Sequence, residues 1–215
     1  LSKRRGRRVR LEIGELARSF GELIAGVRKQ TRLLDDATAQ NQKLLENVMP
    51  KGIAQKMRVG QGDITETIEE VSVVFAQLRG LADYTQATSD EESVAVLRRL
   101  ISAFDEAASR HGAERIKTIG DTYLAVTGLS LPLLDHMRRT VEFARSARGI
   151  VMSFNREKGA SLGLTVGIGS GPVIADVTGQ GQLQFQLWGA AVIAADHAMD
   201  CGGIDDIIVT RTVYD

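Results

Sequence analysis

The 215-residue sequence contains one cysteine, three prolines, three histidines and few aromatic residues, which make up 5% of the chain. A single cysteine, Cys201, excludes an intramolecular disulfide framework and a cysteine-rich zinc site. The histidines are too far apart in the sequence to indicate a metal cluster. Because few aromatics are available to stack on bases, we expect no nucleic-acid partner. The longest apolar stretch, Leu124–Leu134, is shorter than the roughly 20 residues that a membrane span needs.

Basic and acidic residues are equal in number, at 27 each, but they are unevenly distributed. Six of the eight residues 3–10 are lysine or arginine. This cluster is compatible with contact to anionic lipid headgroups or nucleic acid and equally with a solvated connector, and nothing in the rest of the sequence supports nucleic-acid binding. The remaining composition is typical of a globular protein. The sequence shows no secretory signal and almost no cysteine, so we expect a reducing, cytoplasmic environment.

Residues 13–48 carry a regular heptad pattern, which predicts a long coiled-coil helix. With Ile13 at position a, the seam continues without a break to Val48. Asn41 falls at an a position, where asparagine fixes the register and favours a parallel two-stranded pair. A single long helix folded back on its own domain is the alternative. Pro50 ends the segment, because the residue before a proline is disfavoured in a helix.

The remainder of the sequence predicts an α+β domain. Its expected order, β-α-β-β-α-β, is typical of the ferredoxin-like fold. We expect a hairpin with its tight turn at Gly120–Asp121 and a second hairpin around Ser170–Pro172. The expected strands are Val71–Leu78, Glu114–Ile119, Thr122–Val126, Leu162–Ile168, Val173–Val177 and Ile207–Val209, and the expected helices are Ser93–Arg110, Leu134–Arg156 and Ala190–Met199.

Four segments resemble the catalytic domain of class III adenylyl/guanylyl cyclases. They occur in the order and at the spacing of that family, and the second is the most specific: Val73–Gly80, Arg115–Tyr123, Val166–Val173 and Leu187–Gly189. The resemblance implies a head-to-tail homodimer with its active sites at the interface. The family reaction that the resemblance implies is the conversion of ATP to cyclic AMP.

The N-terminal segment is similar to a different signalling element. Residues 11–20 resemble the second helix of a HAMP signal-relay domain. The combined resemblance implies a HAMP remnant with a basic connector at residues 1–20, a signalling coiled-coil helix at 21–50 and a cyclase-like domain at 51–215. It further implies a cytoplasmic portion of an inner-membrane receptor with an upstream membrane segment. The sequence ends before the last hairpin that the resemblance implies.

The resemblance assigns a two-metal site to Gln77 and Asp121. In the family, two carboxylates hold two Mg²⁺ or Mn²⁺ ions against the nucleotide phosphates. Asp121 keeps this carboxylate, whereas Gln77 replaces it with a neutral amide, a poor ligand for a hard dication. We therefore expect Mg²⁺ or Mn²⁺ to bind weakly or not at all. An aspartate that only shapes the hairpin turn is the alternative for Asp121.

The resemblance assigns the other active-site roles to four residues, one of them unchanged. Lys117 is the base-reading lysine, although a lysine on a strand is often simply solvated. Its aspartate partner is replaced by Gln186. The asparagine and arginine that orient the ribose and stabilise the transition state correspond to Ile193 and His197.

These replacements predict a cyclase-like domain that is catalytically weak or inactive and that acts as a dimerising signal-transduction module. Losing one preorganised transition-state donor costs about 10²–10³ in rate, and two are replaced here. Two alternatives stay open. One is a genuine low-activity, Mn²⁺-dependent adenylyl cyclase, and the other is a partner subunit that completes a site with a competent cyclase.

The heptad pattern predicts a homodimer in solution, which sedimentation at micromolar concentration will test. Replacing Asn41→Ile should raise the thermal stability of the dimer, since it removes a buried polar pair, while loosening the choice of register or oligomeric state. A monomer at that concentration would contradict the prediction.

Overall fold

The computed structural model describes residues 23, 24, 26–42, 44, 45, 49–58, 64–179 and 183–214. The chain divides into two compact units, Leu1–Leu45 and Glu46–Asp215. The described residues of the first unit are helical, and Leu23, Val27 and Leu34 of the predicted seam are exposed in the single chain. Pairing of this helix stays a prediction, and the predicted HAMP remnant lies outside the described residues. None of the described helices is long and apolar enough to cross a membrane.

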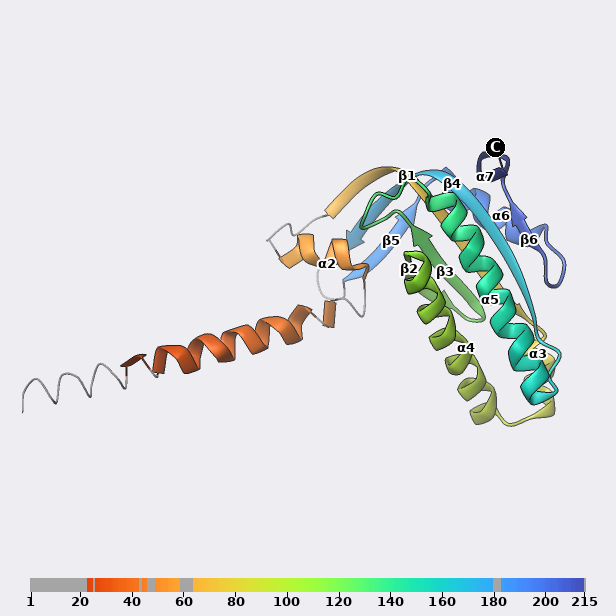
Figure 1. The fold of residues 1–215 in the computed structure, drawn as a ribbon, viewed down its shortest axis with the longest axis horizontal. Helices are drawn as coiled ribbons and strands as arrows, with labels where there is room; N and C mark the ends of the chain where they lie inside the picture. The colour runs from red at the N-terminus through yellow and green to blue at the C-terminus, as the bar shows by residue number, and fades with distance from the viewer. Residues whose placement is uncertain are drawn as a thin grey trace, which may run out of the picture. The chain divides into compact units, whose positions relative to one another are not determined.

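The second unit is built on a six-stranded sheet with the order β2-β3-β1-β4-β5, to which β6 adds by pairing with β4. The β6–β4 pair is parallel and the others are antiparallel. Helices α4 and α5 lie side by side against the sheet (Figure 1). The elements are α2 (Lys51–Arg58), β1 (Ile64–Arg79), α3 (Leu81–Ala87), α4 (Asp90–His111), β2 (Ala113–Ile119), β3 (Thr122–Thr127), α5 (His136–Lys158), β4 (Gly163–Thr178), β5 (Gln184–Trp188), α6 (Ala190–Asp200), β6 (Ile207–Val209) and α7 (Arg211–Tyr214).

The predicted α+β class and the order of its first six elements are confirmed, with β1, α4, β2, β3, α5 and β4 forming the β-α-β-β-α-β unit. The main core lies between the sheet and helices α4 and α5. At its centre the Tyr123 ring packs against Phe104 and Phe143, with ring centroids 5.6 and 6.0 Å apart. The Tyr123 hydroxyl donates to Asp105 Oδ1 at 2.8 Å, which fixes β3 against α4.

The predicted hairpin around Ser170–Pro172 is wrong, because these residues lie inside the continuous strand β4. Opposite them, the register of β1 shifts so that Glu69 and Glu70 face Pro172 alone. Two residues against one is a β-bulge, which bends both strands and increases their twist. A bulge also tolerates the missing N–H of proline in a strand. The true hairpin partner of β4 is β5, which the sequence analysis did not predict.

Two glycines of β4, Gly167 and Gly169, let helix α6 approach the sheet on the face opposite α4 and α5. A Cβ on Gly167 would lie 2.1 Å from the carbonyl oxygen of Ala195, and one on Gly169 would lie 2.5 Å from that of Ala191. Neither distance is possible for a real side chain, so only glycine permits this packing. The glycine-rich segment therefore serves close helix–sheet contact, which sets the position of α6.

A buried polar cluster joins the start of α5 to β1 and β3. The Nδ1 atom of His136 lies 2.8 Å from Ser72 Oγ, and Thr140 Oγ1 donates to Thr127 Oγ1 at 2.8 Å. All four side chains are buried. Desolvation lowers the pKa of His136, although the nearby charges of Glu70 and Asp135 oppose this shift. The imidazole is therefore held neutral in the folded protein.

We expect folding stability to fall as the pH drops below about 6.5, the ordinary pKa of histidine. The unfolded chain binds a proton there that the folded His136 binds less readily, so lower pH favours unfolding. His136→Gln removes this titrating group while keeping an amide that can bond Ser72. The pH dependence of the free energy of unfolding should become flatter by at most about 1.4 kcal/mol per pH unit. Urea unfolding at pH 7.5, 6.5 and 5.5 measures this free energy for each protein. Exposed His197→Gln is the control, and parallel curves for wild type and His136→Gln would contradict the assignment.

Candidate functional site

The two predicted metal positions lie in direct contact on adjacent elements. Gln77 is near the end of β1, and Asp121 is in the turn between β2 and β3. The Gln77 Nε2 atom donates to Asp121 Oδ1 at 3.2 Å, and Thr122 Oγ1 donates to the same oxygen at 3.3 Å. The backbone fixes the arrangement as well, since Leu78 N donates to the carbonyl oxygen of Asp121 at 3.0 Å.

This donor set does not fit two divalent ions. Mg²⁺ and Mn²⁺ need several oxygen ligands, with carboxylates to offset their charge. Asp121 supplies the pair's one carboxylate, and one of its oxygens already accepts two hydrogen bonds. No group of three or more acidic, histidine or cysteine side chains with metal-binding geometry occurs among the described residues. An amide–carboxylate hydrogen bond therefore occupies the position where a metal pair would need two carboxylates.

A second bulge, at Ile116 in β2, determines where Lys117 points. Arg115 and Lys117 pair with consecutive residues of β3, so Ile116 is the extra residue. The bulge places the two basic side chains on opposite faces of the sheet. Arg115 faces α4 and forms an ion pair with Asp105 at 3.3 Å. Lys117 instead shares a face with its register partner Leu124, away from α4.

Lys117 meets the predicted base-reading partner Gln186. Its Nζ atom donates to Gln186 Oε1 at 3.4 Å, a long hydrogen bond, and Gln186 Nε2 lies 3.4 Å from Gln184 Oε1. Lys117 is on β2 and Gln186 is on β5, the two ends of the strand order. In a flat sheet, four spacings of about 4.8 Å would separate these strands by roughly 19 Å. The contact therefore requires a strongly curled sheet.

The two predicted transition-state positions, Ile193 and His197, lie one helical turn apart on α6 and are both exposed. Among the described residues, neither side chain has a hydrogen-bond or ion-pair partner. The isoleucine is 58% exposed and offers no donor or acceptor. The structure thus groups the six predicted residues into three pairs. The hydroxyl of Thr122, which the sequence analysis did not select, joins the Gln77–Asp121 pair.

Replacing Gln77→Asp should create a Mn²⁺ site with Asp121, because it removes the N–H donor and adds a second carboxylate. We expect the Mn²⁺ affinity measured by calorimetry to rise at least about tenfold, a change of about 1.4 kcal/mol. Exposed Gln55→Asp on α2 is the matched control for the added charge. Equal affinities in the two variants would show that Gln77 and Asp121 do not form a metal position.

Comparison with known proteins identifies the family that this chain resembles. Residues 64–215 match the family described as "Adenylate and Guanylate cyclase catalytic domain". An adenylate cyclase of Mycobacterium tuberculosis strain H37Rv is 32% identical over 177 residues, which cover 82% of this chain and 40% of that protein.

Solved structures show the same similarity. The guanylate cyclase domain of RhGC from Catenaria anguillulae, in complex with GTP, is 30% identical with a TM-score of 0.65, covering 69% of this chain and 82% of that one. The adenylyl cyclase CyaB from P. aeruginosa, at 17% identity and a TM-score of 0.64, shares the fold and covers 70% of this chain and 81% of its own. The chain belongs to the class III adenylyl and guanylyl cyclase catalytic domain family.

Proposed function

We propose that this chain is a degenerate class III cyclase domain, catalytically weak or inactive, that transmits signals by dimerisation. One observation carries the proposal: the Gln77 amide donates a hydrogen bond to the Asp121 carboxylate where the family's chemistry uses two acidic metal ligands. A donor directed at this oxygen competes with a cation for the same lone pairs. The Gln77 amide and the Asp121 carboxylate bond each other directly, so this contact does not need a metal ion.

The exposed face of α6 supports the same proposal. Transition-state stabilisation in this chemistry needs hydrogen-bond donors directed at the developing charge on the phosphate. Ile193 has no donor. His197 is shorter than an arginine and lacks the planar fork of five N–H groups that binds phosphate oxygens in pairs. Losing two such groups together with a metal ligand removes most of the catalytic rate enhancement, even where the effects are not additive.

Retention of Lys117 and of its contact with Gln186 supports a role in nucleotide binding without turnover. The lysine ammonium donates, and an amide both donates and accepts, so this pair retains groups that can bond the edge of a base. Binding of ATP at a dimer interface would then stabilise the dimer without producing cyclic AMP. Among the solved relatives, one from Blastocladiella emersonii is described as a non-canonical dimeric guanylyl cyclase domain.

Because the chain spans 40% of the length of its mycobacterial relative, we propose a role for this part alone. The predicted coiled-coil helix would hold two cyclase domains together, and an upstream HAMP element would supply the signal. Dimerisation would then be the output that other parts of the protein or a second cyclase chain detect.

The test is cyclic AMP formation from ATP and Mn²⁺ by the purified protein. Wild type and Gln77→Asp should both be close to background, because Ile193 and His197 leave the transition state unsupported. The quadruple variant Gln77→Asp, Gln186→Asp, Ile193→Asn, His197→Arg restores all groups together and should exceed wild type by at least about 10²-fold.

Two results would contradict the proposal. Wild-type turnover comparable to that of the quadruple variant would mean that Gln77, Gln186 and His197 support an active Mn²⁺-dependent cyclase. Cyclic AMP produced by wild type only after mixing with a competent cyclase chain, above the activity of that chain alone, would favour the partner-subunit alternative. Circular dichroism of each variant controls for folding.

A further inference from the structure

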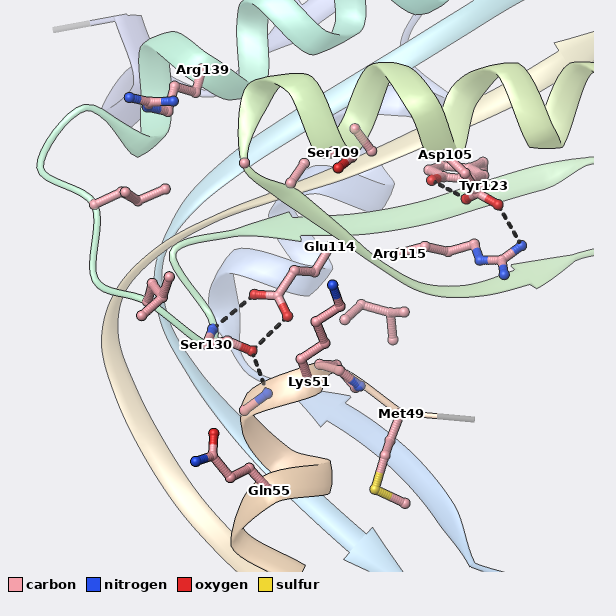
Figure 2. Close-up of a pocket in the computed structure, with 18 residues that line it drawn as sticks. Met49, Lys51, Gln55, Asp105, Ser109, Glu114, Arg115, Tyr123, Ser130 and Arg139 are labelled. Atoms are coloured by element: carbon pink, nitrogen blue, oxygen red, sulfur yellow. Dashed lines mark hydrogen bonds and ion pairs between the residues drawn. The ribbon is translucent and has the colours of Figure 1, made fainter. Parts of the chain in front are cut away.

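A second candidate site lies apart from the predicted metal, base-reading and transition-state positions. A cavity of about 640 Å³ opens between α2, the C-terminal end of α4, the start of β2 and the segment that precedes α5 (Figure 2). This volume is within the range of small-molecule sites, about 300–1,000 Å³. None of the six predicted active-site residues lines it. Apolar side chains form much of its wall: Met49, Pro50, Ala108, Ile116, Leu131 and Leu133.

Rigid contacts hold the cavity open on the α2 side. The Gly52 backbone N–H donates a hydrogen bond to Ser130 Oγ at 2.9 Å. Ser130 in turn donates two hydrogen bonds to the Glu114 carboxylate, one from Oγ at 2.5 Å and one from its backbone N–H at 2.9 Å. A Cβ on Gly52 would lie 2.8 Å from the Ser130 side chain, so only glycine permits this close approach. The start of α2 is therefore fixed to the opposite wall by direct bonds.

The carboxylate oxygens that line the cavity already have partners. Glu114 accepts both hydrogen bonds from Ser130. Asp105 accepts a hydrogen bond from Tyr123 Oη at 2.8 Å and forms an ion pair with Arg115 at 3.3 Å. Asp105 is thus paired with a cation, whereas the neutral donors of Ser130 leave the charge of Glu114 in place but give each of its oxygens a donor.

Basic side chains outnumber these acids at the cavity. Arg115 and Arg139 line it and are paired, the first with Asp105 and the second with Asp135 at 2.7 Å. Lys51 has no hydrogen-bond or ion-pair partner among the described residues. Figure 2 shows its side chain extending from the start of α2 across the cavity in the direction of β2. An unpaired ammonium beside an apolar wall favours an anionic group on an apolar body.

We propose that this cavity binds a small molecule that carries one anionic group on an apolar body, with Lys51 as the residue that contacts the anion. The apolar walls remove the body from water, and the charge-assisted bond to Lys51 fixes its orientation. The ligand would bridge α2 and the cyclase fold, and its binding would strengthen the attachment of α2. The site is independent of the nucleotide positions and of catalytic competence.

Two fluorescent probes that share an apolar body test the proposal with the full chain. Anilinonaphthalene sulfonate carries an anionic group, and N-phenylnaphthylamine lacks it. We expect the sulfonate to bind one site at least about tenfold more tightly than the neutral probe. Lys51→Gln should lower the affinity for the sulfonate probe by a similar factor and change the affinity for the neutral probe less than twofold. Lys56→Gln on the same helix is the control, since Lys56 pairs with Glu66 and does not line the cavity.

A second variant tests the location of the site. Ser109 is exposed on α4 and lines the cavity, so Ser109→Phe fills the space without disturbing the core. It should abolish binding of both probes while urea unfolding stays cooperative. Binding that survives in Ser109→Phe, or equal binding of the two probes to wild type, would overturn the proposal. Displacement of the sulfonate probe by octanoate, octyl phosphate and octanol then identifies the preferred headgroup. Displacement by octanol at the same concentration as the two anions would also overturn the proposal.

Discussion

The bend in strands β1 and β4 is the constraint on which the candidate active site depends. Glu69 and Glu70 of β1 oppose the single residue Pro172 of β4, and beyond this bulge β4 turns to pair with β5. Because the far part of the sheet curls back, Gln186 at one end of the strand order reaches Lys117 at the other. An unbulged, flat sheet would leave these residues too far apart to bond. The contact between Lys117 and Gln186 therefore depends on the bulge in two strands and not on these two side chains alone.

The smaller bulge at Ile116 works in the same way on one side chain. Strand alternation alone would place Arg115 and Lys117 on the same face, and both would then point toward α4. The extra residue separates them, so that Arg115 pairs with Asp105 and lines the cavity beside α2, while Lys117 lies on the other face and meets Gln186. The cavity beside α2 and the Lys117–Gln186 contact therefore lie on different faces of the same strand, although Arg115 and Lys117 are two positions apart in the sequence.

The sequence was sufficient to predict the elements whose signals are local. The Gly120–Asp121 turn, the two long helices and the short strand Ile207–Val209 all follow from periodicity and turn chemistry. The sequence predicts a turn at Gly171–Pro172 because the same two residues suit both a turn and a bulge, and only the register of the partner strand distinguishes the two. The start of α4 at Asp90 was detectable, since Ser89 is followed by three acidic residues and accepts a hydrogen bond from the Glu92 N–H. The contact of Gln77 with Asp121 could not be derived from spacing, because 44 residues separate them.

The amide at position 77 also has a consequence for the stability of the fold. Two carboxylates at hydrogen-bond distance repel each other unless a cation lies between them, so a metal-free acidic pair destabilises the folded state. The amide removes this repulsion and supplies a donor of matching geometry to Asp121 Oδ1. A chain with this substitution keeps the β2–β3 turn attached to β1 whether or not a divalent ion is available, since Leu78 N and Gln77 Nε2 both bond Asp121. The Gln77–Asp121 contact therefore holds this turn in place without requiring a cation between two acidic groups.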